Sequence, residues 1–262
     1  MKGRILFSIL IIFAFEFWSC SKHDDSSSGT LNQATVSAKW VISGTGIGYR
    51  SFEFNKSGNY IVVADDGTKS TAAQIVLFGT YQITDNQTIV LSDLGTLKMS
   101  SISSSSFSFT FTPLNDASGK ISLTSVKAAI TATSAKTDLL CRTWSLVTMD
   151  GESVAGTENE LTVLFSNAGT YYVNRINIPE DSGLAQWGWK DNAQSTLCYS
   201  WEGAPTCDGT NEVLITEVTG TSLKMDEEGE IFILKPATTK SASVKSINNV
   251  KSGVVKSKWF RP

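Results

Sequence analysis

The sequence predicts an all-β protein, built as two tandem antiparallel barrels or curved meander sheets. Short runs of alternating apolar and polar residues recur along the chain, separated by turn residues. No stretch after the N-terminus keeps a helical period of 3.6 residues. A spacing of aromatic residues around a glycine also occurs twice, which indicates an internal repeat.

The individual strands are clearest where the alternation is strict. Ser106–Thr112 places three phenylalanines on one face and hydroxyls on the other, as expected of a half-buried antiparallel strand. Asn55–Gly58 lies between two apolar runs and predicts a hairpin turn, because asparagine, serine and glycine favour turns. Thr84–Gln87 predicts a second hairpin in the same way.

The repeat begins with a tryptophan, Trp40 in the first half and Trp144 in the second. A Phe-x-x-x-Gly-x-Tyr motif follows in each half, at Phe54-Gly58-Tyr60 and at Phe165-Gly169-Tyr171. Further along, the two halves are matched by Phe78-Gly79-Thr80-Tyr81 with Trp187-Gly188-Trp189-Lys190, and by Leu97-Lys98-Met99 with Leu223-Lys224-Met225. We therefore predict one domain over residues 36–128 and another over 138–236, joined by a linker over 129–137.

These motifs are similar to those of the small lipocalin-like domains found in many Bacteroidetes lipoproteins. The resemblance covers most of residues 36–236, in two copies. It implies an antiparallel barrel or strongly curved sheet, whose interior in some such proteins holds a small apolar ligand. It implies no particular activity.

The N-terminus predicts export. Lys2 and Arg4 precede a short apolar run, Ile5–Phe15, which is the pattern of a signal peptide over residues 1–19. Ordinary secretory cleavage favours a small residue at −3, where this chain has Phe17. The junction instead resembles a lipoprotein lipobox, which implies lipidation of Cys20 and a membrane anchor. The alternative is a secreted protein with an incidental cysteine.

Residues 20–35 are then expected to form a flexible tether. Ser21–Asp25 resembles the Bacteroidetes lipoprotein export signal, which implies a place on the outer face of the outer membrane. A charged, solvated tether is the alternative explanation of the same residues. At the other end, residues 237–262 carry lysines and an arginine but no acid, and are predicted to form a basic tail.

The cysteines predict one disulfide. With Cys20 lipidated, three remain in an oxidising compartment. Cys198 and Cys207 flank a turn-rich segment that can bring them together, so we predict that they pair and that Cys141 stays free and buried. A pairing of Cys141 with either of them stays open at this point.

Composition and motifs argue against catalysis and against nucleic-acid binding. A charge of −3 provides no basic surface for nucleic acid. The only histidine is His23, in the tether, so no Ser-His-Asp triad can form and no His-ligated metal site is expected. Phosphate-binding glycine motifs are missing, so no cofactor is expected. Carboxylates such as Glu227 fall in apparent turns and are expected to be solvated.

The second half is distinguished by its aromatic residues. Trp187 and Trp189 lie two residues apart, as do Tyr199 and Trp201, so each pair shares one face of a strand. Pairing of these strands would bring the four rings to one surface, where they could bind a glycan or a small apolar ligand. The alternative is that the rings fill the barrel interior.

We therefore expect a lipid-anchored envelope or cell-surface protein that is not an enzyme. The first hypothesis is capture of a glycan or small apolar ligand by the aromatic face of the second domain. The second hypothesis is a structural or assembly lipoprotein that docks other envelope proteins and has no small-molecule ligand. Outward-facing rings would favour the first hypothesis, and inward-facing rings the second.

Overall fold

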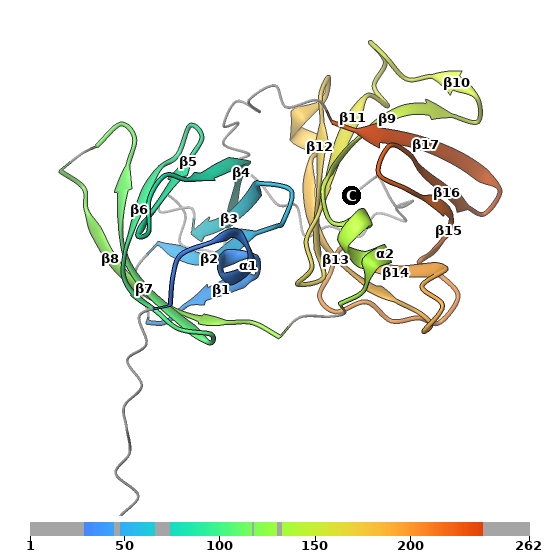
Figure 1. The fold of residues 1–262 in the computed structure, drawn as a ribbon. Helices are drawn as coiled ribbons and strands as arrows, with labels where there is room; N and C mark the ends of the chain where they lie inside the picture. Colours follow the sequence, from blue (N-terminus) through green and yellow to red (C-terminus); the bar gives the residue numbers. More distant parts are fainter. Residues whose placement is uncertain (1–28, 45–47, 66–73, 117, 130–132, 238–262) are drawn as a thin grey trace, which may run out of the picture.

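The computed structural model describes residues 29–44, 48–65, 74–116, 118–129 and 133–237. Over these residues the chain forms two closed antiparallel β-barrels that lie side by side (Figure 1). The predicted fold class, all-β with two tandem barrels, is therefore confirmed. No helix in the described part of the chain is both long and apolar enough to cross a bilayer. The signal peptide, Cys20, His23 and nearly all of the basic tail lie outside the described residues.

Barrel 1 closes by pairing its first and last strands. Its strands are β1 (Lys39–Ile42), β2 (Tyr49–Phe54), β3 (Asn59–Asp65), β4 (Gln74–Ile83), β5 (Thr88–Leu91), β6 (Gly95–Ile102), β7 (Ser106–Pro113) and β8 (Ile121–Lys127).

Barrel 2 closes in the same way, through β9 and β17, and its eight barrel strands are accompanied by β10, a two-residue strand at the edge of β9. Its strands are β9 (Thr143–Met149), β10 (Glu152–Ser153), β11 (Leu161–Phe165), β12 (Thr170–Arg175), β13 (Gly183–Trp189), β14 (Thr196–Ser200), β15 (Glu212–Val218), β16 (Leu223–Glu227) and β17 (Glu230–Pro236). A short 3₁₀ helix, η1 (Pro179–Asp181), connects β12 to β13.

A short helix precedes each barrel and anchors its tryptophan. The indole of Trp40 donates a hydrogen bond to the carbonyl of Val36, the last residue of α1 (Gln33–Val36), at 2.8 Å. Trp144 makes the same bond at 2.8 Å to Leu140, the last residue of α2 (Ala135–Leu140). All four of these side chains are buried. The repeated tryptophan therefore marks the point where each helix packs onto its barrel.

These helices correct two expected boundaries. Residues 29–35, assigned to the tether from the sequence, belong to barrel 1, because Leu31 is buried and Gly29 N–H bonds the carbonyl of Ile102. Likewise α2 begins within the expected linker 129–137. Each helix is too short for the 3.6-residue period to show in the sequence. Asn32 and Ser134 cap the helices with their side chains, and such capping residues are the local signal for a helix start.

The first hairpin of each barrel is built as the repeat predicts. Phe54 pairs with Tyr60 across β2 and β3, and Phe165 pairs with Tyr171 across β11 and β12. The turn glycines Gly58 and Gly169 have φ of +84° and +77°. Side chains with a Cβ avoid this left-handed region, which explains why both turns use glycine.

The two later sequence matches between the halves, residues 78–81 with 187–190 and residues 97–99 with 223–225, are wrong. In the structure Tyr60 pairs with Gly79 and Tyr171 with Ala185, so the counterpart of Trp187 is Tyr81 rather than Phe78. The backbone N–H of Tyr81 donates to the carbonyl of Gly58, and that of Trp187 donates to the carbonyl of Gly169, so each contacts the turn glycine of the first hairpin in its barrel. Leu97-Lys98-Met99 lies on the sixth strand of barrel 1, whereas Leu223-Lys224-Met225 lies on β16, the seventh barrel strand of barrel 2. The halves therefore correspond strand by strand and differ in strand and loop length.

Side chains fill both barrel interiors. In barrel 1 the alternating phenylalanines Phe107, Phe109 and Phe111 of β7 point inward, as predicted, and Phe107 stacks on Trp40 with ring centroids 3.6 Å apart. In barrel 2 the equivalent core contains Trp144 and Trp187. Both barrels are thus packed cores, with aromatic rings supplying much of the volume.

The barrels contact each other through the outer faces of corresponding strands (Figure 1). This interface is a buried apolar cluster, drawn from β3 and β4 of barrel 1 and from β11, β12 and β13 of barrel 2. Its members are Ile61, Val63, Val76, Phe78, Leu164 and Tyr172, with Leu184 packed against them. Lys56 of the β2–β3 turn adds an exposed ion pair with Asp138 of α2, at 2.8 Å.

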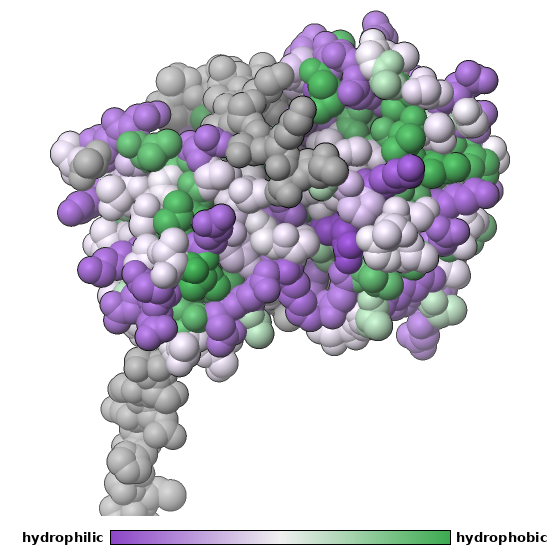
Figure 2. Space-filling view, turned by 45° about the horizontal axis from the view of Figure 1, so that its top comes forward, coloured by the Kyte–Doolittle hydropathy of each residue, from purple (hydrophilic) through white to green (hydrophobic). Residues whose placement is uncertain are grey.

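The outer surface is otherwise mixed. Figure 2 shows hydrophilic and neutral residues over much of the visible face, with hydrophobic residues in separate patches. The large hydrophobic side chains that stand exposed in the described part of the chain are Val41, Val90, Leu114, Val126, Ile176 and Leu214. Val41 and Val126 face each other across β1 and β8.

Candidate functional site

The four aromatic residues singled out in the sequence share the inner side of barrel 2. Trp187 and Tyr199 are directly paired across β13 and β14, and only 1% and 2% of them are exposed. Trp189 and Trp201 are half-buried and pack against the same core. The predicted strand pairing is therefore present, but the surface that it creates faces the barrel interior.

Trp187 is held as a core residue. Its indole N–H donates to the carbonyl of Ser166 at 3.1 Å, and its ring meets Phe165 and Trp189 edge to face. Trp189 lies at the α2 end of the barrel, where its indole donates to the Thr137 hydroxyl at 3.0 Å and Lys136 stands over its ring. Contacts within the protein therefore explain the position of both rings, and no ligand is needed to explain it.

Trp201 is placed differently. It follows β14 directly, meets the ring of Tyr171 edge to face at 5.4 Å, and also lines a groove on the outside of the barrel. Its indole N–H is buried and has no hydrogen-bond partner among the described residues. Packing alone therefore holds the ring between the barrel interior and the groove.

The groove runs between the two barrels and has a volume of about 350 Å³. Barrel 1 contributes residues of β1 to β4, and barrel 2 contributes residues of β12 to β14 and of the loop that follows. The lining residues are Lys39, Val41, Arg50, Ser51, Val63, Gln74, Thr170, Leu184, Ala185, Gln186, Ser200, Trp201 and Gly203. An aromatic ring beside amides, hydroxyls and cations is the composition expected of a site for a polar ligand.

The two cations of the groove are each paired with an acid that is not part of the lining. Lys39 forms an ion pair with Glu53 at 2.9 Å and donates a hydrogen bond to the hydroxyl of Thr170 at 3.3 Å, so it bridges the two barrels. Glu53 is 1% exposed although it points away from the core of barrel 1, because barrel 2 covers it. Arg50 pairs through Nε with Asp65 while its side chain stays 43% exposed. None of the lining residues that the structure describes is an acid.

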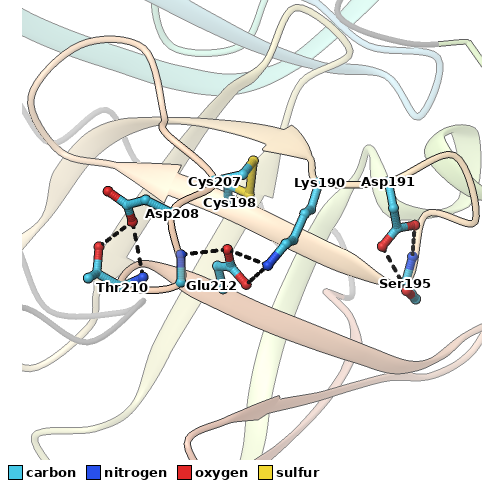
Figure 3. Close-up of polar contacts among 9 residues, drawn as sticks. Lys190, Asp191, Ser195, Cys198, Cys207, Asp208, Thr210 and Glu212 are labelled. Carbon is cyan, nitrogen blue, oxygen red and sulfur yellow. Dashed lines mark hydrogen bonds and ion pairs between the residues drawn. A yellow bond between two sulfur atoms is a disulfide. The ribbon is translucent and has the colours of Figure 1, made fainter.

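A disulfide closes the loop that carries Trp201 and Gly203. Cys198 and Cys207 are bonded, with Cα atoms 5.3 Å apart, which confirms the predicted pairing, and Cys141 is free and buried. The segment beyond the disulfide is fixed by its own contacts (Figure 3). Lys190 donates to both oxygens of Glu212, at 2.8 and 2.6 Å, and Glu212 accepts from the N–H of Gly209.

The same region holds two self-contained turns, visible on either side of the disulfide in Figure 3. Thr210 donates from its hydroxyl and its backbone N–H to Asp208, and these bonds hold the pKa of that carboxyl below its ordinary value. Hydrogen bonds from the backbone and the hydroxyl of Ser195 do the same for the pKa of Asp191. Both turns are therefore ordered by hydrogen bonds within the turn.

One polar residue was missed in the sequence. Glu227 was expected to be a solvated turn residue, but it points into barrel 2, is 5% exposed, and accepts a hydrogen bond from the Tyr199 hydroxyl at 2.5 Å. Burial, and then this carboxylate, raise the pKa of Tyr199. The signal in the sequence was the alternation Leu223, Met225, Glu227, which places all three side chains on one face.

The described residues contain no group of three or more histidine, cysteine, aspartate or glutamate side chains arranged to hold a metal ion. No protein-family model matches the chain, and a search of curated proteins found no significant match either.

Proposed function

We propose that this chain is a lipid-anchored lipoprotein with tandem lipocalin-like barrels that binds a saccharide at the envelope or cell surface, without catalysing a reaction. The groove between the barrels is the proposed site, and the observation that carries the proposal is its lining. Trp201 offers a ring face for a sugar, and Ser51, Gln74 and Gln186 offer hydrogen-bonding groups around it.

This proposal places the ligand in the groove rather than on a surface of four rings. Trp187 and Tyr199 fill the barrel, and Trp189 is engaged by α2, which leaves Trp201 as the member of the set that lines the groove. A small apolar ligand inside barrel 2 would have to displace these packed rings. A polar ligand in the groove requires no such rearrangement.

The test is calorimetric titration of residues 21–262 with a panel of neutral and acidic oligosaccharides. Saturable binding that Trp201→Ala abolishes and Trp189→Ala leaves intact would support the groove as the site. Trp189 is the matched control, since it is a half-buried tryptophan of the same barrel outside the groove. Trp201→Leu keeps apolar volume but lacks the flat ring, so it replaces Trp201→Ala in this test if Trp201→Ala does not fold. Absence of binding across the panel would contradict the proposal.

The anchor is tested separately. Lipidation of Cys20 predicts that the chain incorporates a fatty-acid label and fractionates with membranes, and that Cys20→Ala abolishes both. Protease treatment of whole cells then distinguishes an outward-facing protein, which is degraded, from a periplasmic one, which is protected. A soluble, unlabelled wild-type chain would show that the cysteine is incidental.

A second candidate function is a structural lipoprotein that docks other envelope proteins. The inward packing of Trp187 and Tyr199 favours it, because a filled barrel is a rigid body with no need of a ligand. Photo-crosslinking from exposed positions such as Val126 or Leu214 in cells tests this function. A defined crosslinked partner, together with no saccharide binding in the panel, would favour docking.

A further inference from the structure

We infer that the groove selects acidic saccharides, with Arg50 and Lys39 binding the carboxylate or sulfate group while Trp201 holds the sugar ring. This inference rests on the proposed function and specifies its ligand class. Three observations on the charge and rigidity of the groove support it.

The distribution of charge in the groove is the first observation. The lining residues that the structure describes include two cations and no acid, although the chain as a whole has a net charge of −3. Each cation is paired with an acid beside the lining, so the groove presents cationic groups to a ligand without a net positive charge of its own. A cationic group at the surface of the groove can attract an anionic ligand.

The pairing of the cations is the second observation. Glu53 is buried below the groove, so its ion pair with Lys39 fixes the ammonium group in place, and Thr170 adds a second contact to that group. Asp65 engages the Nε of Arg50, which leaves the terminal guanidinium nitrogens outside that pair. A guanidinium oriented by one carboxylate can bind another anion through two parallel hydrogen bonds.

The rigidity of the site is the third observation. Lys39 contacts both barrels, and the apolar interface behind it fixes the two walls relative to each other. The disulfide fixes the loop that carries Trp201. A preorganised arrangement of ring and cations loses little conformational entropy on binding, which increases affinity for a ligand that matches both.

The experiment compares ligands that differ in charge alone. Oligogalacturonides are titrated beside the same oligosaccharides with their carboxyl groups reduced to hydroxymethyl groups, and chondroitin sulfate oligosaccharides form the sulfate arm. We expect the acidic form to bind at least tenfold more tightly than its reduced counterpart, since a charge-assisted hydrogen bond is stronger than a neutral one. We also expect this preference to shrink as salt rises.

Arg50→Gln provides the residue-level test and Lys120→Gln its control, because Lys120 is exposed and lies outside the groove lining. Arg50→Gln should weaken binding of the acidic form more than binding of the reduced form, so that most of the acidic preference is lost. Lys120→Gln should change neither.

The outcomes separate the two proposals. Equal binding of the acidic and reduced forms, or better binding of the reduced form, would overturn the acidic preference while saccharide binding stands. An acidic preference that survives Arg50→Gln would overturn the assignment to this groove. Binding of neither form, nor of any other oligosaccharide in the panel, would reject the proposed function itself.

Discussion

The ring of Phe78 on β4 lies 4.6 Å from the ring of Tyr172 on β12, measured between centroids, and joins barrel 1 to barrel 2. Both side chains point away from their own barrel cores, yet 6% and 1% of them are exposed. The two barrels therefore share a third apolar cluster in addition to the two barrel cores.

Phe78→Ala should destabilise the whole chain rather than barrel 1 alone. Truncation of a buried phenylalanine costs about 3–5 kcal/mol, and here the loss falls on the contact between the barrels. Denaturant unfolding, followed by circular dichroism and by tryptophan fluorescence, measures the change. Val90→Ala is the control, because Val90 is a half-exposed apolar residue on β5 of the same barrel. Equal, small effects of both substitutions would show that the interface contributes little.

The Lys39–Glu53 pair occupies the position that Thr143 and Leu164 occupy in barrel 2, since both pairs face each other across the first two strands. Lys39→Thr combined with Glu53→Leu copies the second arrangement into the first. We expect the double variant to equal the wild type in stability or to exceed it by about 1–4 kcal/mol, because burying an ion pair is costly.

Lys39→Thr alone should instead destabilise the chain by about 3–5 kcal/mol, since it leaves Glu53 buried without its cation. Glu53→Leu alone should cost less, because the side chain of Lys39 is 26% exposed and keeps access to water. The same unfolding experiment ranks the three variants. A double variant that is as unstable as Lys39→Thr would show that the ion pair is needed for the fold.

The tyrosines should resist ionisation in the folded protein. Burial raises the pKa of all six, Tyr49, Tyr60, Tyr81, Tyr171, Tyr172 and Tyr199, above the ordinary value. The unfolded chain releases these protons near pH 10 while the folded chain retains them. The stability that they contribute is therefore complete below about pH 10 and is lost as the pH rises further.

Ultraviolet absorbance of tyrosinate, recorded beside circular dichroism during an alkaline titration, checks this prediction. We expect the phenols to ionise together as the barrels unfold, in a step that coincides with the loss of the circular dichroism signal. The same titration in denaturant gives the unfolded reference. A phenol that titrates near pH 10 with the fold intact would contradict the burial described above.

Removal of the disulfide by Cys198→Ser and Cys207→Ser should lower the free energy of unfolding by about 2–3 kcal/mol, the value expected for a loop of this length. It should also weaken saccharide binding, because the closed loop carries Trp201. Cys141 is an internal reference, since burial raises the pKa of its thiol and should keep it unreactive toward alkylating reagents until the chain unfolds. Rapid alkylation of the native protein would show that this end of barrel 2 is open.

Parts of this structure followed from local sequence, and parts did not. The hairpin motif Phe-x-x-x-Gly-x-Tyr was predictable because register and a positive φ are properties of a few neighbouring residues. The later correspondence of Phe78 with Trp187 failed because strand and loop lengths differ between the halves after the first hairpin.

The alternation of residues along the strands could not show whether the four aromatic rings face the barrel interior or the solvent. A period of two residues shows which side chains share a face, and closure of the sheet decides whether that face lies inside. The groove depends on how the barrels sit together, which is a long-range property. One signal for it was present: Ile61-Val62-Val63 and Tyr171-Tyr172-Val173 are apolar on both faces, as expected of strands buried on both sides.

The contact between the barrels uses corresponding positions. Ile61 follows Tyr60 as Tyr172 follows Tyr171, and both lie in the shared cluster. Two identical subunits meet in this way in a twofold dimer, so this contact does not require both barrels to belong to one polypeptide. Their short connection favours the partner on the same chain by holding it at a millimolar effective concentration. Only at protein concentrations above that value would intermolecular pairing compete, and we expect it to give a domain-swapped dimer in which barrel 1 of one molecule pairs with barrel 2 of another.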